Sequence, residues 1–90
     1  MIANKIKVPQ ASLLYKYNEK YDILDVYIDK IVPVISDEIY TGVYDYFDEN
    51  TEELVGISIM DYTTRNKEFL KNILPFDINF NYIQSNIMKA

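Results

Sequence analysis

The sequence contains no cysteine and no histidine among its 90 residues. Structural zinc sites are built from these two residue types, and cysteine nucleophiles and histidine bases are excluded with them. The remaining chemical groups form no glycine-rich phosphate loop, nucleophile elbow or metal motif. We therefore predict no catalytic residue, no metal site and no cofactor. The lack of cysteine also fits a cytoplasmic location, which we expect.

Basic residues are few as well: nine Lys and Arg stand against 14 Asp and Glu, and the formal net charge is −5. Phosphate backbones are bound mainly by clustered Lys and Arg, so we expect no direct binding of nucleic acid. An acidic domain suits a basic protein partner, although the same charge also promotes solubility. No segment approaches the roughly 20 apolar residues of a membrane span, and no signal-peptide run opens the chain, so we expect no membrane association.

Linker-like material is also scarce, since the chain has two glycines and three prolines. Ninety residues are too few for two cores without a staple. Nine tyrosines and four phenylalanines favour a pleated sheet over a helical bundle. We predict a single α+β domain over 1–90, with an N-terminal arm (1–11), a sheet plus helix (12–74) and a C-terminal tail (75–90).

Alternation of apolar and polar residues predicts the first strands. Residues 12–17 and 23–29 both alternate, and the second pattern is the cleaner one. Residues 31–35 are apolar but contain Pro33, which cannot donate to a ladder, so they predict an edge segment or a crossover. Residues 36–38 are expected to lead into the next hairpin.

The stretch from 42 to 62 predicts a central hairpin with a polar connection at 48–53. In its second arm Val55, Ile57 and Ile59 share one face, which is the stronger candidate for the core.

A helical period follows over 62–74 and predicts one amphipathic helix that closes the core. Pro75 should end it. The candidate N-caps are Asp61, Thr63 and Thr64. The tail at 75–90 alternates at first and then takes a helical spacing. It either returns to its own sheet, adds a strand to a second subunit, or stays disordered until it meets a partner.

Several blocks resemble a known family. They are YNEKYDIL (17–24), DVYI (25–28), DEI (37–39), GVY (42–44), FDE (47–49) and ELVGISIMD (53–61). Together they resemble the small bacterial domain-of-unknown-function family numbered 2283. The resemblance implies a twisted antiparallel sheet of about four strands, a β-meander, with one helix on it and no established catalytic residues. It also implies an antitoxin-type role, because genes of that family look like neighbours of small toxin-like genes.

Carboxylates and tyrosines are the candidate site residues. A metal or acid–base cluster of Asp22, Asp25, Asp29, Asp45 and Asp48 would need convergence that their spacing does not provide, so we expect solvated charges. Asp45 shares a face with apolar neighbours, so that face is open or a cation such as Lys16 or Arg65 pairs with it. An exposed aromatic strip is one interpretation of the tyrosines, and coverage by the helix is the other. The predicted partner-binding residues are Tyr27, Tyr44, Tyr46, Phe76, Ile78, Phe80 and Tyr82.

These observations lead to three hypotheses of function. The first is a non-enzymatic protein–protein interaction domain, most specifically an antitoxin that neutralises a basic toxin. A charge-based variant of it is an acidic inhibitor that mimics nucleic acid. The second is a self-associating structural homodimer joined by sheet edges or exchanged tails. The third, an enzyme using carboxylate and tyrosine chemistry, has no motif to support it.

Overall fold

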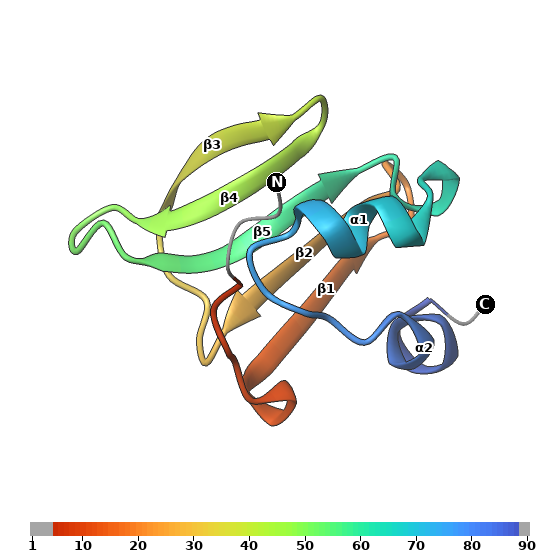
Figure 1. The fold of residues 1–90 in the computed structure, drawn as a ribbon, viewed down its shortest axis with the longest axis horizontal. Coiled ribbons are helices and arrows are strands. Elements are labelled where there is room, and N and C mark those ends of the chain that lie inside the picture. The colour runs from red at the N-terminus through yellow and green to blue at the C-terminus, as the bar shows by residue number, and fades with distance from the viewer. Residues whose placement is uncertain (1–4, 89–90) are drawn as a thin grey trace.

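A computed structural model describes residues 5–88 and shows an α+β fold built on one five-stranded antiparallel sheet (Figure 1). The elements are η1 (Gln10–Ser12), β1 (Leu13–Asn18), β2 (Ile23–Ile28), β3 (Val34–Tyr40), β4 (Val43–Asp48), β5 (Leu54–Met60), η2 (Tyr62–Thr64), α1 (Lys67–Ile73), α2 (Phe80–Tyr82) and η3 (Ile83–Ile87). No helix in the described part of the chain is long and apolar enough to cross a membrane.

The strand order is β1-β2-β5-β4-β3, which differs from a simple meander of four strands. β3, β4 and β5 are joined by consecutive hairpins, and the β1–β2 hairpin adds to β5 through β2. The additional strand is β3, which contains the residues expected only to lead into the hairpin. Pro33 directly precedes it, and β3 lies at the edge of the sheet, where a nearby proline is tolerated.

One face of the sheet forms the core. Leu24, Val26, Ile57 and Ile59 are fully buried, as is Val43 from β4. The cross-strand register places Leu24, Ile59 and Val43 in one row across three strands. The prediction that Ile57 and Ile59 of the second hairpin arm face the core is therefore confirmed. These residues share one face because successive side chains of a strand alternate, and that face packs against the helical layer.

The predicted helix is shorter than 62–74. Residues 62–64 form the short turn η2, and α1 begins at Lys67 after Asn66. The Asn66 side chain accepts a hydrogen bond from the backbone N–H of Phe69 at 2.9 Å, so Asn66 is the N-cap, and the three predicted caps are wrong. The C-terminal prediction is confirmed, since Leu74, just before Pro75, is already extended at φ −72° and ψ 146°.

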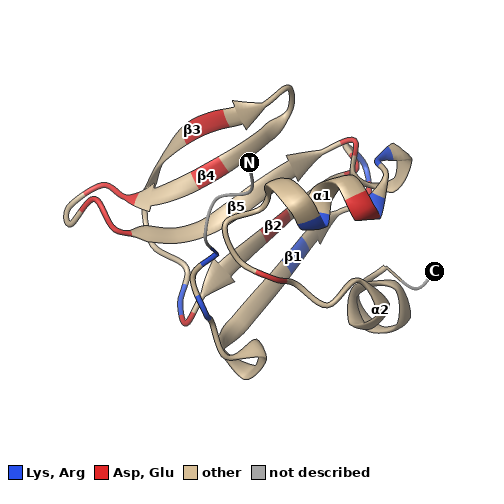
Figure 2. Ribbon diagram, in the orientation of Figure 1, with Lys and Arg blue, Asp and Glu red and all other residues tan. Residues whose placement is uncertain are grey.

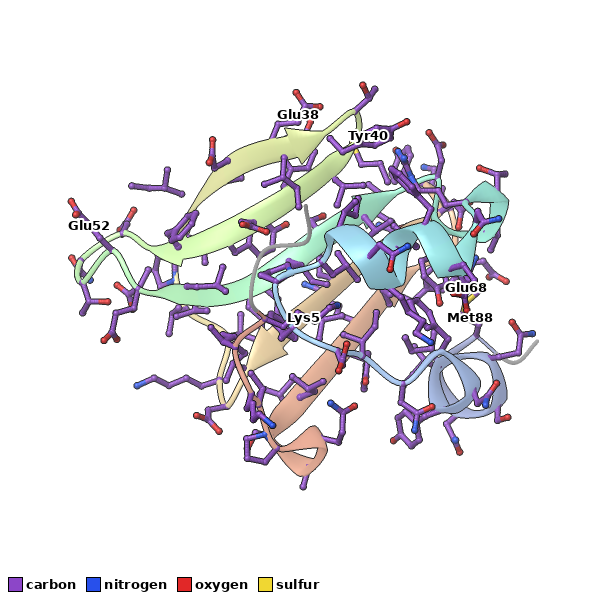
Figure 3. All side chains as sticks on the ribbon, viewed as in Figure 1. Lys5, Glu38, Tyr40, Glu52, Glu68 and Met88 are labelled. Carbon is purple, nitrogen blue, oxygen red and sulfur yellow. The ribbon has the colours of Figure 1, made fainter. Side chains whose placement is uncertain are left out.

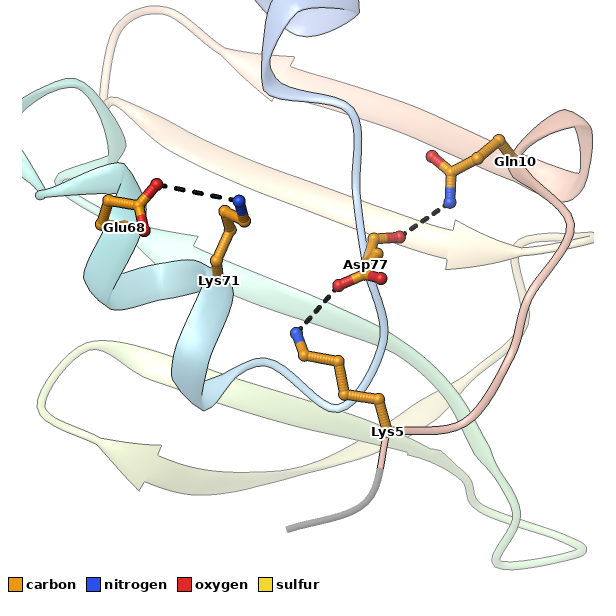
Figure 4. Close-up of polar contacts among 5 residues, drawn as sticks. All are labelled: Lys5, Gln10, Glu68, Lys71 and Asp77. Atoms are coloured by element: carbon orange, nitrogen blue, oxygen red, sulfur yellow. Dashed lines mark hydrogen bonds and ion pairs between the residues drawn. The ribbon is translucent and has the colours of Figure 1, made fainter. Parts of the chain in front are cut away.

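The tail returns to its own sheet. Phe76 is fully buried, Ile78 is 8% exposed and Ile83 is fully buried, and all three belong to the single hydrophobic core. Its strand-like alternation is misleading, because residues 80–87 are helical and pack beside β1. Polar contacts also fasten it: Asp77 forms an ion pair with Lys5 at 3.1 Å and accepts a hydrogen bond from Gln10 (Figure 4).

Coverage of the core face is uneven. In Figure 1, α1 crosses β5 and β2, and the tail helix lies beyond β1. β3 and β4 extend past the helix on the other side, and only the C-terminal end of β3 approaches α1. Within residues 5–88, no helix lies over most of β3 and β4, although Val43 at the start of β4 is part of the core. We therefore call β1, β2 and β5 the covered half of the sheet and β3 and β4 the uncovered half.

Candidate protein-binding surface

Two carboxylates lie directly opposite each other in the uncovered half. The β3–β4 register pairs Asp37 with Asp45, and the β4–β5 register pairs Asp45 with Ile57 on the core face. Side chains directly opposite in an antiparallel pair have Cβ atoms about 5 Å apart, where like charges are destabilising. The protein therefore holds a repulsive pair on the same face as its hydrophobic core.

Among residues 5–88, Asp45 has no partner that relieves this repulsion. Its Oδ1 atom is buried, and within the described residues it has no hydrogen-bond donor. Burial first, and then the charge of Asp37, raise the pKa of the Asp45 carboxyl above its ordinary value. Both effects disfavour the charged form, and a cation placed between the two carboxylates would oppose both.

Neither cation proposed from the sequence pairs with Asp45. Lys16 pairs across the ladder with Asp25, on the opposite face of the sheet. Arg65 instead ties the β3–β4 turn to the end of β5, since its guanidinium donates to the carbonyl oxygens of Thr41 (2.8 Å) and Met60 (2.6 Å). Gly42 makes this possible, because it has φ +77° and a Cβ there would collide with Arg65. The predicted structural ion pair at Asp45 is absent from residues 5–88.

Exposed apolar side chains flank the two carboxylates. Ile35, two residues before Asp37 on the same face of β3, is 55% exposed. Tyr40 is 49% exposed and packs edge-on against Phe69 of α1, with ring centroids 4.8 Å apart. Figure 3 shows Tyr40 and Glu38 at this rim of the molecule. We call Ile35, Asp37, Tyr40, Asp45 and Phe69 together the β3 surface.

Charge is segregated along the chain in the same direction. Residues 31–64 hold eight of the 14 acidic residues and none of the nine basic ones. In Figure 2 the β3 and β4 ribbons carry acidic positions only. Basic positions lie on the N-terminal arm, β1, the β1–β2 turn, the loop between β2 and β3, and the α1 region. The uncovered half is therefore the strongly acidic part of the molecule.

The predicted tyrosine residues lie on the other face of the sheet, away from α1. Tyr27 and Tyr46 are both cross-strand partners of Gly56, and their rings meet over it with centroids 5.5 Å apart. Tyr46 donates a hydrogen bond to Asp25, and burial, followed by that carboxylate, raises the Tyr46 pKa to about 12. Tyr27 is only 8% exposed, while Tyr44 and Tyr46 are half-buried. The helix does not cover these rings, but much of their area is packed within the sheet itself.

The predicted tail residues divide into two groups. Phe76 and Ile78 are buried in the protein's own core, so in this structure they are not available as contact residues. The reason is that the tail supplies the second layer over the sheet, a long-range contact that local pattern does not reveal. Phe80 is half-buried, and Tyr82 is 46% exposed while leaning on Tyr15 with ring centroids 5.5 Å apart.

The aspartates considered as a cluster are dispersed. No group of three or more Asp or Glu side chains within residues 5–88 is arranged to hold a metal ion. Asp22, at φ 55° in the β1–β2 turn, accepts hydrogen bonds from the Tyr17 hydroxyl at 2.8 Å and from the Thr63 hydroxyl and backbone. Burial acts to raise the pKa of Asp22, but these hydrogen bonds outweigh it and the pKa lies below its ordinary value. Asp22 is therefore a structural link between the turn and η2 and not a solvated charge.

Comparison with known proteins adds nothing to this description: no family model, curated protein or solved structure matches the chain. The resemblance to family 2283 stays a prediction. Sequence reasoning missed Asp37 and Ile35, because β3 was not predicted as a strand. Residues 34–40 show no apolar–polar alternation, so the only signal of an edge strand was the apolar run around Pro33, which does not reach Asp37.

Proposed function

We propose that this protein is a non-enzymatic interaction domain that binds a basic protein through the β3 surface. The observation that carries the proposal is the Asp45 carboxylate, which is partly buried, faces Asp37 and has an oxygen with no donor within residues 5–88. Such a pair costs stability in the free protein. A Lys or Arg from a partner would convert that cost into a charge-assisted contact.

Solubility alone does not account for this arrangement. A solvated surface charge needs no burial, and its effect does not depend on placing two carboxylates opposite each other. Here β3 and β4 carry four acidic residues and no basic one, and two of the four, Asp37 and Asp45, lie beside exposed Ile35, Tyr40 and Phe69. An apolar patch combined with a single sign of charge is typical of a surface that recognises a partner of opposite charge.

The most specific form of the proposal is an antitoxin-like protein whose partner is a basic toxin. It rests on the resemblance to family 2283 together with the charge. The β3 surface itself requires only that the partner present Lys or Arg beside an apolar patch.

Self-association is the second candidate, and β3 bears on it directly. Asp37 is the central residue of Val34–Tyr40. Two copies pairing β3 against β3 in the antiparallel register centred on Asp37, the one that pairs the whole strand, would place Asp37 opposite its own copy and add further like charges to the pair. The geometry therefore favours a basic partner over a homodimer joined at this edge.

The test is affinity capture from an extract of the source cells on the immobilised full chain. Three baits are compared: the unaltered protein, the Asp37→Asn/Asp45→Asn double variant, and a control double variant, Glu19→Gln/Asp29→Asn. The control removes two exposed charges, in the β1–β2 turn and directly after β2, that are not part of the β3 surface. We expect a basic protein on the unaltered and control baits that is lost from the double variant. Equal retention on all three baits would contradict the proposal.

A further inference from the structure

The free edge of β3 provides a second recognition element besides its charge. β3 is the last strand of the sheet, so every second backbone N–H and C=O along its seven residues has no ladder partner. At the opposite edge, β1 has the helical tail beside it, with the Asn79 N–H donating to the Tyr15 hydroxyl. Within residues 5–88 nothing comparable lies along β3 in Figure 1.

The register of the sheet determines what an added strand would meet. A residue placed opposite Asp37 has its side chain on the same face as Asp37 and, one strand further, Asp45. Only a long cationic side chain satisfies both carboxylates from there. The neighbour two positions away on one side shares that face and would lie near Ile35. On the other side the register shifts between Glu38 and Tyr40, and this irregularity puts the Tyr40–Phe69 pair on the same face, three residues after Asp37.

The other face of β3 does not require a cationic side chain from an added strand. Ser36 and Glu38 lie there, and the Glu38 carboxylate already accepts a hydrogen bond from the backbone N–H of Gly42 at 2.9 Å. The alternate side chains of an added strand would therefore meet a hydroxyl and an engaged carboxylate, and small polar residues are sufficient at those positions.

We infer that the partner contributes an extended segment that adds to the β3 edge, with Lys or Arg opposite Asp37 and an apolar residue two positions to each side. The inference rests on the proposed function and specifies how the β3 surface recognises its partner. Main-chain hydrogen bonds would supply affinity and the alternate side chains specificity, as in other cases of strand addition.

The experiment is a selection of linear peptides from a random library on the immobilised full chain. The most enriched peptide is then studied with the isotope-labelled full chain by NMR. We expect enriched peptides to share a basic residue flanked by apolar residues two positions away. We also expect alternate β3 amides to become protected from exchange on binding. A proline at the position next to the basic residue should abolish binding, because it removes a ladder donor.

Variants separate the possible outcomes. Asp37→Asn should weaken the selected peptide about tenfold or more, and Glu19→Gln/Asp29→Asn should leave it unchanged. Basic peptides that need Asp37 and Asp45 but tolerate proline and leave the β3 amides unprotected would overturn strand addition and leave the proposed function standing. Enriched peptides without a basic residue, or binding indifferent to both aspartates, would overturn the two together.

Discussion

Asp22 and Asp45 show how differently the two halves of the sheet treat a carboxylate. Asp22, in the covered half, accepts hydrogen bonds from Tyr17 and Thr63, and its pKa is lowered. Asp45, in the uncovered half, has a buried oxygen without a donor and a second carboxylate opposite, and its pKa is raised. The covered half uses its charge for stability. In the uncovered half, burial and a like charge disfavour the ionised carboxylate of Asp45, a cost in stability that the proposed basic partner would offset.

The largest expected effect is the difference in unfolding free energy between a substitution in the core and one on the edge strand β3. Phe76→Ala removes a fully buried ring and should lower the free energy of unfolding by about 3–5 kcal/mol. Ile35→Ala, at a side chain 55% exposed, should lower it by less than about 1 kcal/mol. Urea denaturation of both variants tests this. Equal losses would show that the tail is not part of the core or that β3 is covered.

The second comparison isolates the hydrogen bonds of Asp22. Asp22→Ala should cost about 2–3 kcal/mol, because it removes several charge-assisted hydrogen bonds and places alanine at φ 55°. Asp29→Ala is the matched control, since Asp29 has φ 68° and is exposed. The control should show only the backbone cost, about 1 kcal/mol. Thermal or urea unfolding that gave the two variants the same loss would remove the structural role of Asp22.

A smaller effect tests the start of α1. Asn66→Ala should destabilise the protein by about 1 kcal/mol, because it removes the side chain that accepts from Phe69 N–H. Asn66→Ser should recover most of that loss. Thr63 offers no cap to α1, so Thr63→Ala should act only through its contact with Asp22. An unchanged unfolding midpoint for Asn66→Ala would place the cap elsewhere.

The smallest expected effect is an increase in stability, whereas the preceding substitutions decrease it. At neutral pH, Asp37→Asn removes the repulsion with Asp45 and should stabilise the free protein by about 0.5 kcal/mol. Because the folded pKa of Asp45 is raised above its unfolded value, this group's contribution to stability is fully present below the unfolded value and is lost as pH rises through the folded one. The stability gain from Asp37→Asn should therefore shrink as the pH is lowered toward the unfolded pKa of aspartate, near 4. Asp29→Asn is the charge-matched control and should show no such gain.

The sequence predicted what is fixed by local burial and local turns. Alternation of apolar and polar residues located β1 and β2, and the hairpin pattern with its polar connection located β4 and β5. Pro75 marked the end of α1 through a steric effect on the residue before it. β3 was not predicted over its full length, because it is exposed along almost all of it and its sequence has no pattern of buried positions.

The candidate site was harder to predict than the fold. Asp45 attracted attention by its position on an apolar face, but the repulsion depends on Asp37, which reaches it only through β3–β4 pairing. The tail seemed available for a partner because Phe76 and Ile78 lack local contacts. Their burial comes from packing across the whole chain, and sequence spacing carries no record of it.

The most direct test of the central claim is an NMR titration of the side-chain carboxyl carbons in the free full-length protein. A single sample reports both Asp22 and Asp45. We expect the Asp45 midpoint to lie above the ordinary aspartate value, to fall in Asp37→Asn, and to stand above that of Asp22, which should lie below the ordinary value. An Asp45 midpoint at or below the ordinary value would mean that its charge is already satisfied within the chain, and the argument for a basic partner on the β3 surface would lose its foundation.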